Sequence, residues 1–321
     1  MNELMKKISS YGIVPVIKLD EVEKAVPLAK ALCTGGLPVA EVTFRTDAAE
    51  ESIRRISTEV PDILVGAGTV LTIEQVDRAV RAGAKFIVSP GFNSKIVGYC
   101  MENGITIIPG TSSPSDMEAA IELGLDVVKF FPAEQSGGSA YLKAVSGPFP
   151  KLKFMPTGGV NAKNLNEYLS LPNVIACGGS WMVNPDLISE GNFDEITRIT
   201  KEAVINMLGF EFVHVGINCS GAEEADEVTS KLCDMFGFIN KAGNASNFAG
   251  TGVEVLKKKY LGEMGHVAVR TNNIERAIEY FRMRSIGFNE KSKVVDEKGN
   301  TKAIYFADEI GGFAFHLLQK S

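Results

Sequence analysis

Short apolar runs alternate with amphipathic stretches along residues 13–207, and this alternation repeats eight times. The runs are rich in β-branched residues, which favour strands. The stretches between them, such as residues 21–36 and 72–84, carry apolar residues three and four apart and end at or beside glycine, as amphipathic helices do. The predicted strands are residues 13–19, 38–44, 63–69, 86–90, 106–110, 127–132, 153–159 and 174–180. Eight strand–helix units of this length predict an α/β fold, a (β/α)₈ TIM barrel.

The pattern changes near residue 208 and then repeats itself once. Each half opens with a strand, continues with a helical stretch that ends in a Gly-Phe pair, and closes with strands. The predicted strands are residues 210–219, 252–259, 265–271, 301–308 and 312–319, and the helices are residues 221–238 and 272–288. The first half lacks strand-like sequence between Phe238 and Val253. A repeat of roughly 50 residues predicts a small pseudo-symmetric α+β domain. We therefore expect a barrel over residues 1–208 and a second domain over residues 209–321.

Composition places the chain of 321 residues among ordinary globular proteins, with 45% apolar residues, 22% charged residues and a net charge of −6. A mildly acidic chain is a poor binder of nucleic acid. No apolar run is long enough to cross a bilayer. The five cysteines are odd in number and form no CxxC pair, which indicates reduced thiols. We expect a cytoplasmic protein with neither a nucleic-acid nor a membrane partner.

Polar residues at the carboxyl ends of the barrel strands are the candidates for chemistry, because active sites of such barrels lie there. Strand alternation directs Lys129 into the barrel, and it places Glu41 and Arg45 together on one face of the second strand. Burial among apolar neighbours favours a neutral amine, which can attack a ketone. Lys129 can equally form a structural ion pair with Glu41. The pattern leaves both interpretations open.

Two Gly-Gly pairs follow the last two predicted strands of the barrel. They are Gly158-Gly159 and Gly178-Gly179, and Ser180 comes next. Free backbone N–H groups at these adjoining loops form the phosphate site common in such barrels. Glycine also serves tight turns, which suffices to explain a single glycine. Two pairs at these loops favour a phosphate site.

The motifs EVTFRT, VGAGTV, SPG, IPG, VKFFPAE, GPF, PTGGV and GGSWMV occur in this order on the predicted strands. With them, residues 1–207 resemble the KDPG/KHG aldolase family, which comprises 2-keto-3-deoxy-6-phosphogluconate and 4-hydroxy-2-oxoglutarate aldolases. The resemblance implies that Lys129 forms a Schiff base with the keto acid and that Glu41 is the general acid/base. It implies that Arg45 and Thr69 hold the substrate carboxylate near Thr157, that Phe131 and Pro90 wall the pyruvyl end, and that Gly158, Gly159, Gly179 and Ser180 receive the phosphate.

The implied activity is that of a lyase. It would cleave 2-dehydro-3-deoxy-6-phosphogluconate to pyruvate and glyceraldehyde 3-phosphate, and 4-hydroxy-2-oxoglutarate to pyruvate and glyoxylate. The galactonate epimer stays open as a substrate, and so does a phosphosugar isomerase in which Lys129 acts without a covalent bond. No cofactor is expected for the aldolase. The resemblance also implies a homotrimer.

All three histidines lie in the second domain, at positions that follow its repeat. His214 and His266 occupy matching places in the opening strands, and Glu254 and His316 occupy matching places in the closing strands. This domain resembles the vicinal-oxygen-chelate (VOC) superfamily, to which glyoxalase belongs, and the resemblance implies a divalent metal at these four residues. Three imidazoles and one carboxylate suit Zn²⁺, Fe²⁺, Ni²⁺ or Mn²⁺.

A histidine at the position of His316 departs from the glutamate usual in that superfamily. Isolated histidines on strands are also common as core or surface residues. The domain can therefore be a metal-dependent enzyme, or a module for binding or oligomerisation.

Overall fold

The computed structural model describes residues 1–320. The chain divides into two compact units, the first spanning Met1–Met207 and the second beginning at Leu208. This division lies one residue before the boundary expected from the sequence. Within residues 1–320, no sheet contains strands of both units.

All the strands predicted for the first unit are present, one of them in two pieces. The strands are β1 (Ile13–Ile17), β2 (Val39–Thr43), β3 (Leu64–Gly68), β4 (Ile87–Val88), β5 (Ile107–Ile108), β6 (Gly110–Thr111), β7 (Val127–Phe130), β8 (Lys153–Pro156) and β9 (Cys177–Gly179). β5 and β6 are separated by Pro109, which has no N–H to donate.

Parallel pairing arranges these strands in a ring. One sheet has the order β5-β4-β3-β2-β1-β9 and the other the order β6-β7-β8. Bridges from Phe154 to Val174 and from Thr157 to Gly178 join β8 to the segment of β9. The predicted (β/α)₈ barrel is confirmed.

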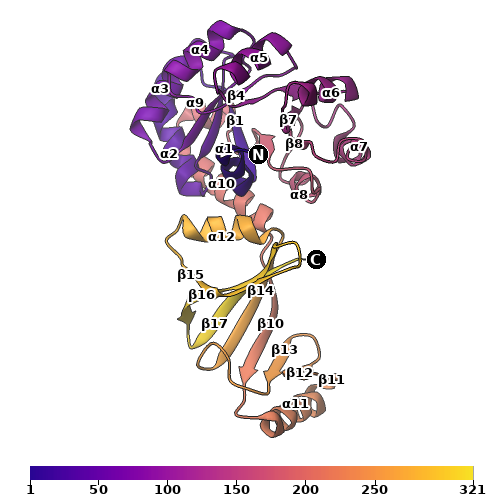
Figure 1. Ribbon diagram of the computed structural model, residues 1–321. Coiled ribbons are helices and arrows are strands. Elements are labelled where there is room, and N and C mark those ends of the chain that lie inside the picture. The colour runs from indigo at the N-terminus through magenta and orange to yellow at the C-terminus, as the bar shows by residue number, and fades with distance from the viewer. Residues whose placement is uncertain (321) are drawn as a thin grey trace. The chain divides into compact units, whose positions relative to one another are not determined.

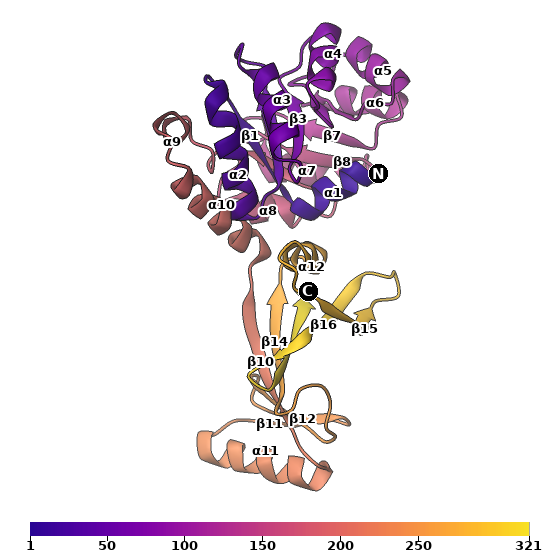
Figure 2. The same cartoon turned by 90° about the vertical axis from the view of Figure 1, so that its left-hand side faces the viewer.

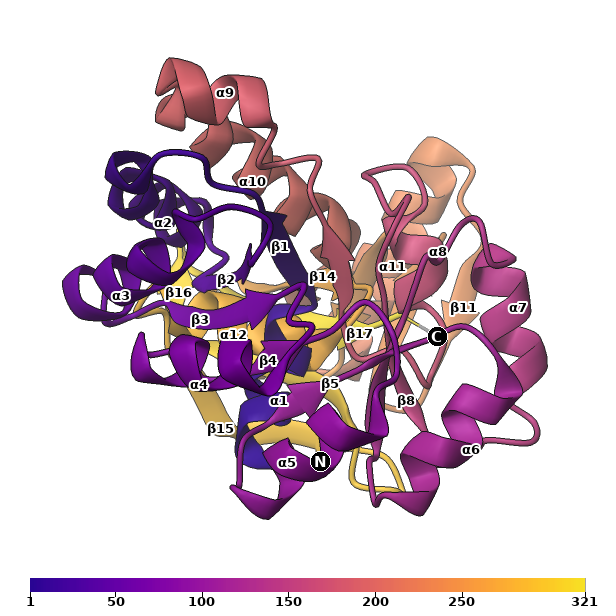
Figure 3. The ribbon, with the colours of Figure 1, turned by 90° about the horizontal axis from the view of Figure 1, so that it is seen from above.

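Helices follow the strands and surround them, as the view from above shows for α2 to α8 (Figure 3). The helices are α1 (Glu3–Tyr11), η1 (Val22–Lys24, a 3₁₀ helix), α2 (Ala25–Gly35), α3 (Ala49–Glu59), α4 (Ile73–Arg81), α5 (Ser94–Glu102), α6 (Pro114–Glu122), α7 (Gly138–Val145), α8 (Leu165–Leu169), α9 (Pro185–Glu190) and α10 (Phe193–Leu208). Several begin at a polar residue whose side chain accepts a backbone N–H of the first turn. Examples are Thr72 of α4 and Ser113 of α6.

The amino-terminal end of the barrel is filled with apolar side chains. Met5, Ile8 and Tyr11 of α1 pack there against strand residues that include Val14 and Met155. Because this end is packed with apolar groups, polar chemistry is confined to the opposite end, where the strands finish.

The second unit contains one sheet of order β11-β12-β13-β10-β14-β17-β16-β15, part of which is visible in Figure 1. Each half consists of a strand, a helix and three strands. The elements are β10 (Glu211–Asn218), α11 (Ala222–Phe236), β11 (Asn240–Ala242), β12 (Ser246–Ala249), β13 (Val253–Leu256), β14 (Gly265–Thr271), α12 (Ile274–Arg282), β15 (Phe288–Val295), β16 (Thr301–Ile310) and β17 (Phe313–Gln319). α11 packs against β12 and β13, and α12 packs against β16 and β17 (Figure 2).

The expected shortage of strand sequence between Phe238 and Val253 is wrong, because β11 and β12 lie there. These strands are short and largely polar, so they carry no apolar alternation. They form because β12 pairs antiparallel with both β11 and β13. The sequence pattern does not predict β15 either, and among the strands of residues 1–320 it pairs only with β16.

Within residues 1–320, no helix is long and apolar enough to span a membrane.

Candidate active site and metal centre

Lys129 of β7 and Glu41 of β2 meet inside the barrel, although 88 residues separate them in the chain. The Lys129 Nζ lies 3.4 Å from Oε1 of Glu41, and the two residues are only 5% and 1% exposed. The other carboxylate oxygen, Oε2, is buried and has no hydrogen-bond partner among the described residues. A buried acceptor of this kind needs a water or a substrate group to satisfy it. The pair therefore combines an amine with a carboxylate that can exchange protons.

Neighbouring strands and helices fix the orientation of Lys129. Its backbone N–H donates to the Pro109 carbonyl at 2.9 Å, and the Thr111 hydroxyl donates to its carbonyl at 3.1 Å. Phe130 stacks on Tyr141 of α7, on the helix side of the strand. Lys129 instead shares a side with Phe131, whose ring centre is 5.1 Å from Nζ. The predicted alternation of faces in this strand is confirmed.

A cavity of about 410 Å³ lies at the carboxyl ends of the strands, and it is lined by Phe131, whose ring centre is 5.1 Å from the Lys129 Nζ. It is lined by most of the residues expected to bind substrate. These are Arg45, Phe131, Thr157, Gly158, Gly159, Gly179 and Ser180.

Arg45 and Thr69 form one side of the site. The Arg45 Nε donates to the Thr69 hydroxyl at 3.1 Å, which leaves the two terminal nitrogens for a planar partner such as a carboxylate. The backbone of Thr69 has a φ of 55°, in the left-handed region. This conformation is costly for a β-branched residue and is concentrated at functional sites.

The two glycine loops lie side by side, because Thr157 pairs with Gly178. Gly158 and Gly159 have φ values of 96° and 84°, which side chains rarely adopt. Gly179 is required for lack of space, because a Cβ at this position would lie 1.9 Å from the Trp181 ring. The loops therefore present backbone rather than side chains to the cavity.

The cavity lining differs from the expected site. Among the described residues, it does not include Lys129, Glu41, Thr69 or Pro90. Lys18, which the prediction omits, lines the cavity directly after β1. Its place at the carboxyl end of a predicted strand was the signal available in the sequence.

In the second unit, His214, Glu254, His266 and His316 come together on one face of the sheet. They belong to four adjacent strands, β10, β13, β14 and β17. Gly216 is the register partner of both Glu254 and His266, and Ala268 is the partner of both His214 and His316. Because residues two apart share a face, this register directs all four side chains to the same side.

The donor atoms of this cluster converge. The Nε2 atoms of His214 and His266 are 3.0 Å apart, and each lies 3.2 Å from Oε2 of Glu254. One ligand atom of each of the three histidines lies within 4.8 Å of the others. His266 Nδ1 and both ring nitrogens of His316 are buried with no hydrogen-bond partner in the described part of the chain.

The electrostatics of the cluster favour metal-binding forms. Hydrogen bonds from His214 and His266 hold the pKa of Glu254 far below its usual range, so the carboxylate is ionised. Burial, followed by the charges of His266 and His214, lowers the pKa of His316 to about 3, so its imidazole is neutral. The Ser246 hydroxyl donates to Oε1 of Glu254 at 2.5 Å, and the Tyr305 ring stacks on His316. An ionised carboxylate and a neutral imidazole are the forms that bind metal.

Known proteins resemble the first unit closely. The 2-dehydro-3-deoxy-phosphogluconate aldolase of Treponema pallidum is 48% identical over 204 residues, which are 64% of this chain and 97% of that protein. The KHG/KDPG aldolase of Escherichia coli is 45% identical over 197 residues, which are 61% of this chain and 92% of that protein.

A solved structure shows the same similarity. The KDPG aldolase of Legionella pneumophila, with pyruvate captured as a covalent carbinolamine, is 42% identical and superposes with a TM-score of 0.61 over 62% of this chain and 97% of that chain. The sequence pattern of the KDPG and KHG aldolases matches residues 4–199, which include Lys129, Glu41 and both glycine loops. The chain therefore belongs to the KDPG and KHG aldolase family.

Proposed function

We propose that this chain is a class I aldolase that cleaves 2-dehydro-3-deoxy-6-phosphogluconate to pyruvate and glyceraldehyde 3-phosphate. The observation that carries the proposal is the buried pair of Lys129 and Glu41, 3.4 Å apart, beside a cavity lined by Arg45 and the glycine loops. A nucleophile, an acid/base and two anion-binding elements are what this reaction requires.

Substrate binding uses both ends of the cavity. Arg45, oriented by Thr69, holds the carboxylate next to the keto group. The backbone N–H groups of the two glycine loops, together with Ser180, receive the phosphate. The keto carbon C2 is then presented to Lys129.

Lys129 forms the covalent intermediate. Its neutral amine attacks C2 and gives a carbinolamine, and Glu41 delivers a proton to the departing hydroxyl, which leaves as water. The product is a protonated imine between Lys129 and C2, which draws electrons from the adjacent bond.

Cleavage follows at the C3–C4 bond. The Glu41 carboxylate takes the proton of the C4 hydroxyl through water, the C3–C4 electron pair moves toward the imine nitrogen, and glyceraldehyde 3-phosphate leaves. C3 of the resulting enamine then takes a proton, and hydrolysis of the imine releases pyruvate and the free amine of Lys129.

The test is reductive trapping with pyruvate and borohydride. We expect a mass increase on the peptide that contains Lys129, no increase in Lys129→Ala, and a normal increase in Lys95→Ala, which changes an exposed lysine. Glu41→Gln should turn over slowly and still be trapped to some extent. An isomerase with a non-covalent lysine would give neither adduct nor pyruvate, and that outcome would refute the mechanism.

The substrate range is a finer question. The relative from Escherichia coli is named for both substrates, which supports activity on 4-hydroxy-2-oxoglutarate as well. Measuring pyruvate release from 2-dehydro-3-deoxy-6-phosphogluconate, its galactonate epimer and 4-hydroxy-2-oxoglutarate ranks the three by kcat/KM. We expect the gluconate compound to rank first.

For the second unit we propose a divalent metal site formed by His214, Glu254, His266 and His316. The observation that supports it is the convergence of donor atoms from four strands, with buried ring nitrogens that nothing in the described chain satisfies. A bound metal would supply Lewis-acid chemistry there, and borderline ions such as Zn²⁺, Ni²⁺ or Fe²⁺ suit three imidazoles.

Metal analysis of the full chain tests this site. After incubation with Zn²⁺ and removal of free metal, we expect one ion per chain, and a loss of at least 10-fold in affinity in His266→Ala. Glu263→Gln changes an exposed carboxylate of the same unit and should bind as the parent does. Equal binding by His266→Ala and the parent chain would exclude the proposed ligand set.

Family resemblance also supports a homotrimer, and five free thiols support a reducing compartment such as the cytoplasm. The mass in solution, measured by light scattering at several concentrations, tests the first of these. A stable monomer would contradict it.

A further inference from the structure

We propose that Lys18 supplies the positive charge that binds the substrate phosphate, and that it sets the preference of this aldolase for phosphorylated over unphosphorylated 2-keto-3-deoxy acids. The inference rests on the proposed aldolase function and on the phosphate site at the glycine loops. It adds a side chain that the motifs of the resemblance do not include.

Strand register places Lys18 beside the glycine loops. β1 pairs in parallel with β9, and Pro15 is the partner of Gly179. Lys18 follows β1 directly, and Ser180 follows β9 directly. Both residues therefore leave the barrel at the same end of adjacent strands, and both line the cavity.

The charges around the cavity leave the phosphate end without another cation. Among the described residues that line it, Lys18 and Arg45 are the charged ones. Arg45 is tied to Thr69 at the carboxylate end. Backbone N–H groups carry only partial charges, whereas a phosphate ester has a charge near −2 at neutral pH. Lys18 is the remaining full charge that can neutralise it.

The ion pair between Lys18 and Asp20 is weak. The Lys18 Nζ lies 2.9 Å from Asp20, and the two side chains are 46% and 65% exposed. An exposed ion pair of this kind contributes little. An ammonium group has three N–H donors. Lys18 can therefore bind a phosphate oxygen either while it stays paired with Asp20 or in place of that contact.

Two substrates that differ only in the phosphate group test this role. We expect Lys18→Gln to lower kcat/KM for 2-dehydro-3-deoxy-6-phosphogluconate roughly 10- to 100-fold, mainly through KM, because one charged hydrogen bond is lost. For unphosphorylated 2-dehydro-3-deoxygluconate, kcat/KM should stay within about 2-fold. Lys18→Arg should recover most of the loss, and the exposed Lys95→Gln should change neither substrate.

The outcomes separate the possible failures. An unchanged ratio of the two kcat/KM values in Lys18→Gln, or an equal fall for both substrates, would overturn the role of Lys18 while leaving the aldolase intact. Absence of pyruvate release by the parent chain would instead refute the proposed function. If Lys18→Gln keeps the ratio of kcat/KM for the phosphorylated substrate to that for the unphosphorylated one, and Ser180→Ala loses it, the loops alone bind the phosphate.

Discussion

At the scale of single residues, Thr69 shows that the site is built at a cost to the backbone. Its φ of 55° is unfavourable for a threonine, by about 1–2 kcal/mol. The strain places its hydroxyl beside the Arg45 guanidinium. Thr69→Gly should therefore relieve strain and also remove the group that orients Arg45.

For Thr69→Gly we expect no loss of unfolding free energy, and a gain of up to about 1 kcal/mol, since the greater freedom of glycine in the unfolded chain offsets part of the relief. We expect kcat/KM to fall roughly 3- to 10-fold through the lost hydrogen bond. Chemical denaturation and steady-state kinetics measure the two quantities. The same substitution at Thr58 in α3 should destabilise the chain and leave kcat/KM unchanged. A large loss of stability in Thr69→Gly would contradict the strain argument.

Gly68 has no side chain and so leaves room for the Glu41 carboxylate. A Cβ at this position would lie 2.3 Å from Oε1 of Glu41, the oxygen that faces Lys129. Gly68→Ala should displace the carboxylate and lower kcat roughly 100-fold, the size of a typical acid/base contribution. Gly98→Ala in α5 meets open space and should leave kcat unchanged.

A double-mutant cycle distinguishes displacement of Glu41 from general damage to the barrel. If Gly68→Ala acts through Glu41, it should have little further effect on kcat in a Glu41→Gln background. A further 100-fold fall in that background would show that the barrel itself is disturbed.

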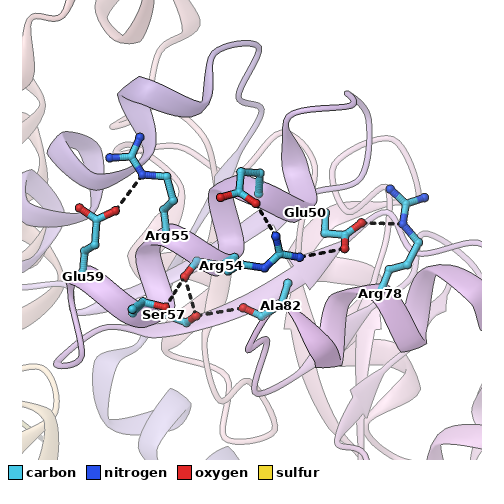
Figure 4. A network of polar contacts seen from close by, with 9 residues as sticks. Glu50, Arg54, Arg55, Ser57, Glu59, Arg78 and Ala82 are labelled. Atoms are coloured by element: carbon cyan, nitrogen blue, oxygen red, sulfur yellow. Dashed lines mark hydrogen bonds and ion pairs between the residues drawn. The ribbon is translucent and has the colours of Figure 1, made fainter.

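At the scale of elements, polar contacts join α3 to α4 on the barrel surface (Figure 4). Glu50 accepts from Arg78 at 2.7 Å and from Arg54 at 3.1 Å, and the Ser57 hydroxyl donates to the Ala82 carbonyl at 2.9 Å. The ion pairs are partly exposed, so solvent screens them. Packing of apolar side chains such as Ile53 holds α3 more strongly.

This difference predicts unequal effects of two substitutions in α3. Glu50→Gln should cost less than about 1 kcal/mol of unfolding free energy, and this cost should shrink in high salt. Ile53→Ala, at a fully buried position, should cost about 2–5 kcal/mol. Urea denaturation at low and high salt measures both. A larger effect of Glu50→Gln would mean that the network, rather than the core, fixes the helix.

At the scale of the whole molecule, the chain consists of two compact units, each with its own sheet or sheets. The proposed metal ligands come from both halves of the second unit, so metal would link those halves. Metal that binds only the folded state stabilises it by about 2.7 kcal/mol at 100 times its Kd. The active site of the first unit uses none of these ligands.

We therefore expect two thermal transitions in the metal-loaded chain. Chelation should lower the midpoint of the transition of the second unit by several degrees, while the other transition and aldolase turnover stay unchanged. Calorimetry with and without chelator measures the first effect, and a pyruvate assay measures the second. A proportional loss of aldolase activity on chelation would show that the two units are coupled.

The sequence by itself determined the barrel strands, the direction of Lys129 into the barrel and the two glycine loops. These features rest on local properties: apolar runs mark strands, alternation sets the face of a side chain, and glycine permits positive φ. The repeat in the second unit was likewise readable from the sequence. From these local signals alone, Lys129 and Glu41 could equally have been a structural ion pair.

Tertiary structure decided what depends on pairing between distant segments. β11, β12 and β15 carry little apolar pattern and exist because neighbouring strands offer them hydrogen bonds. The same holds for the sites. Strand register brought Lys18 to the glycine loops, left Pro90 outside the cavity lining, and gathered three histidines and Glu254 on one face. No single segment encodes these distances, because each is set by how strands far apart in the chain align.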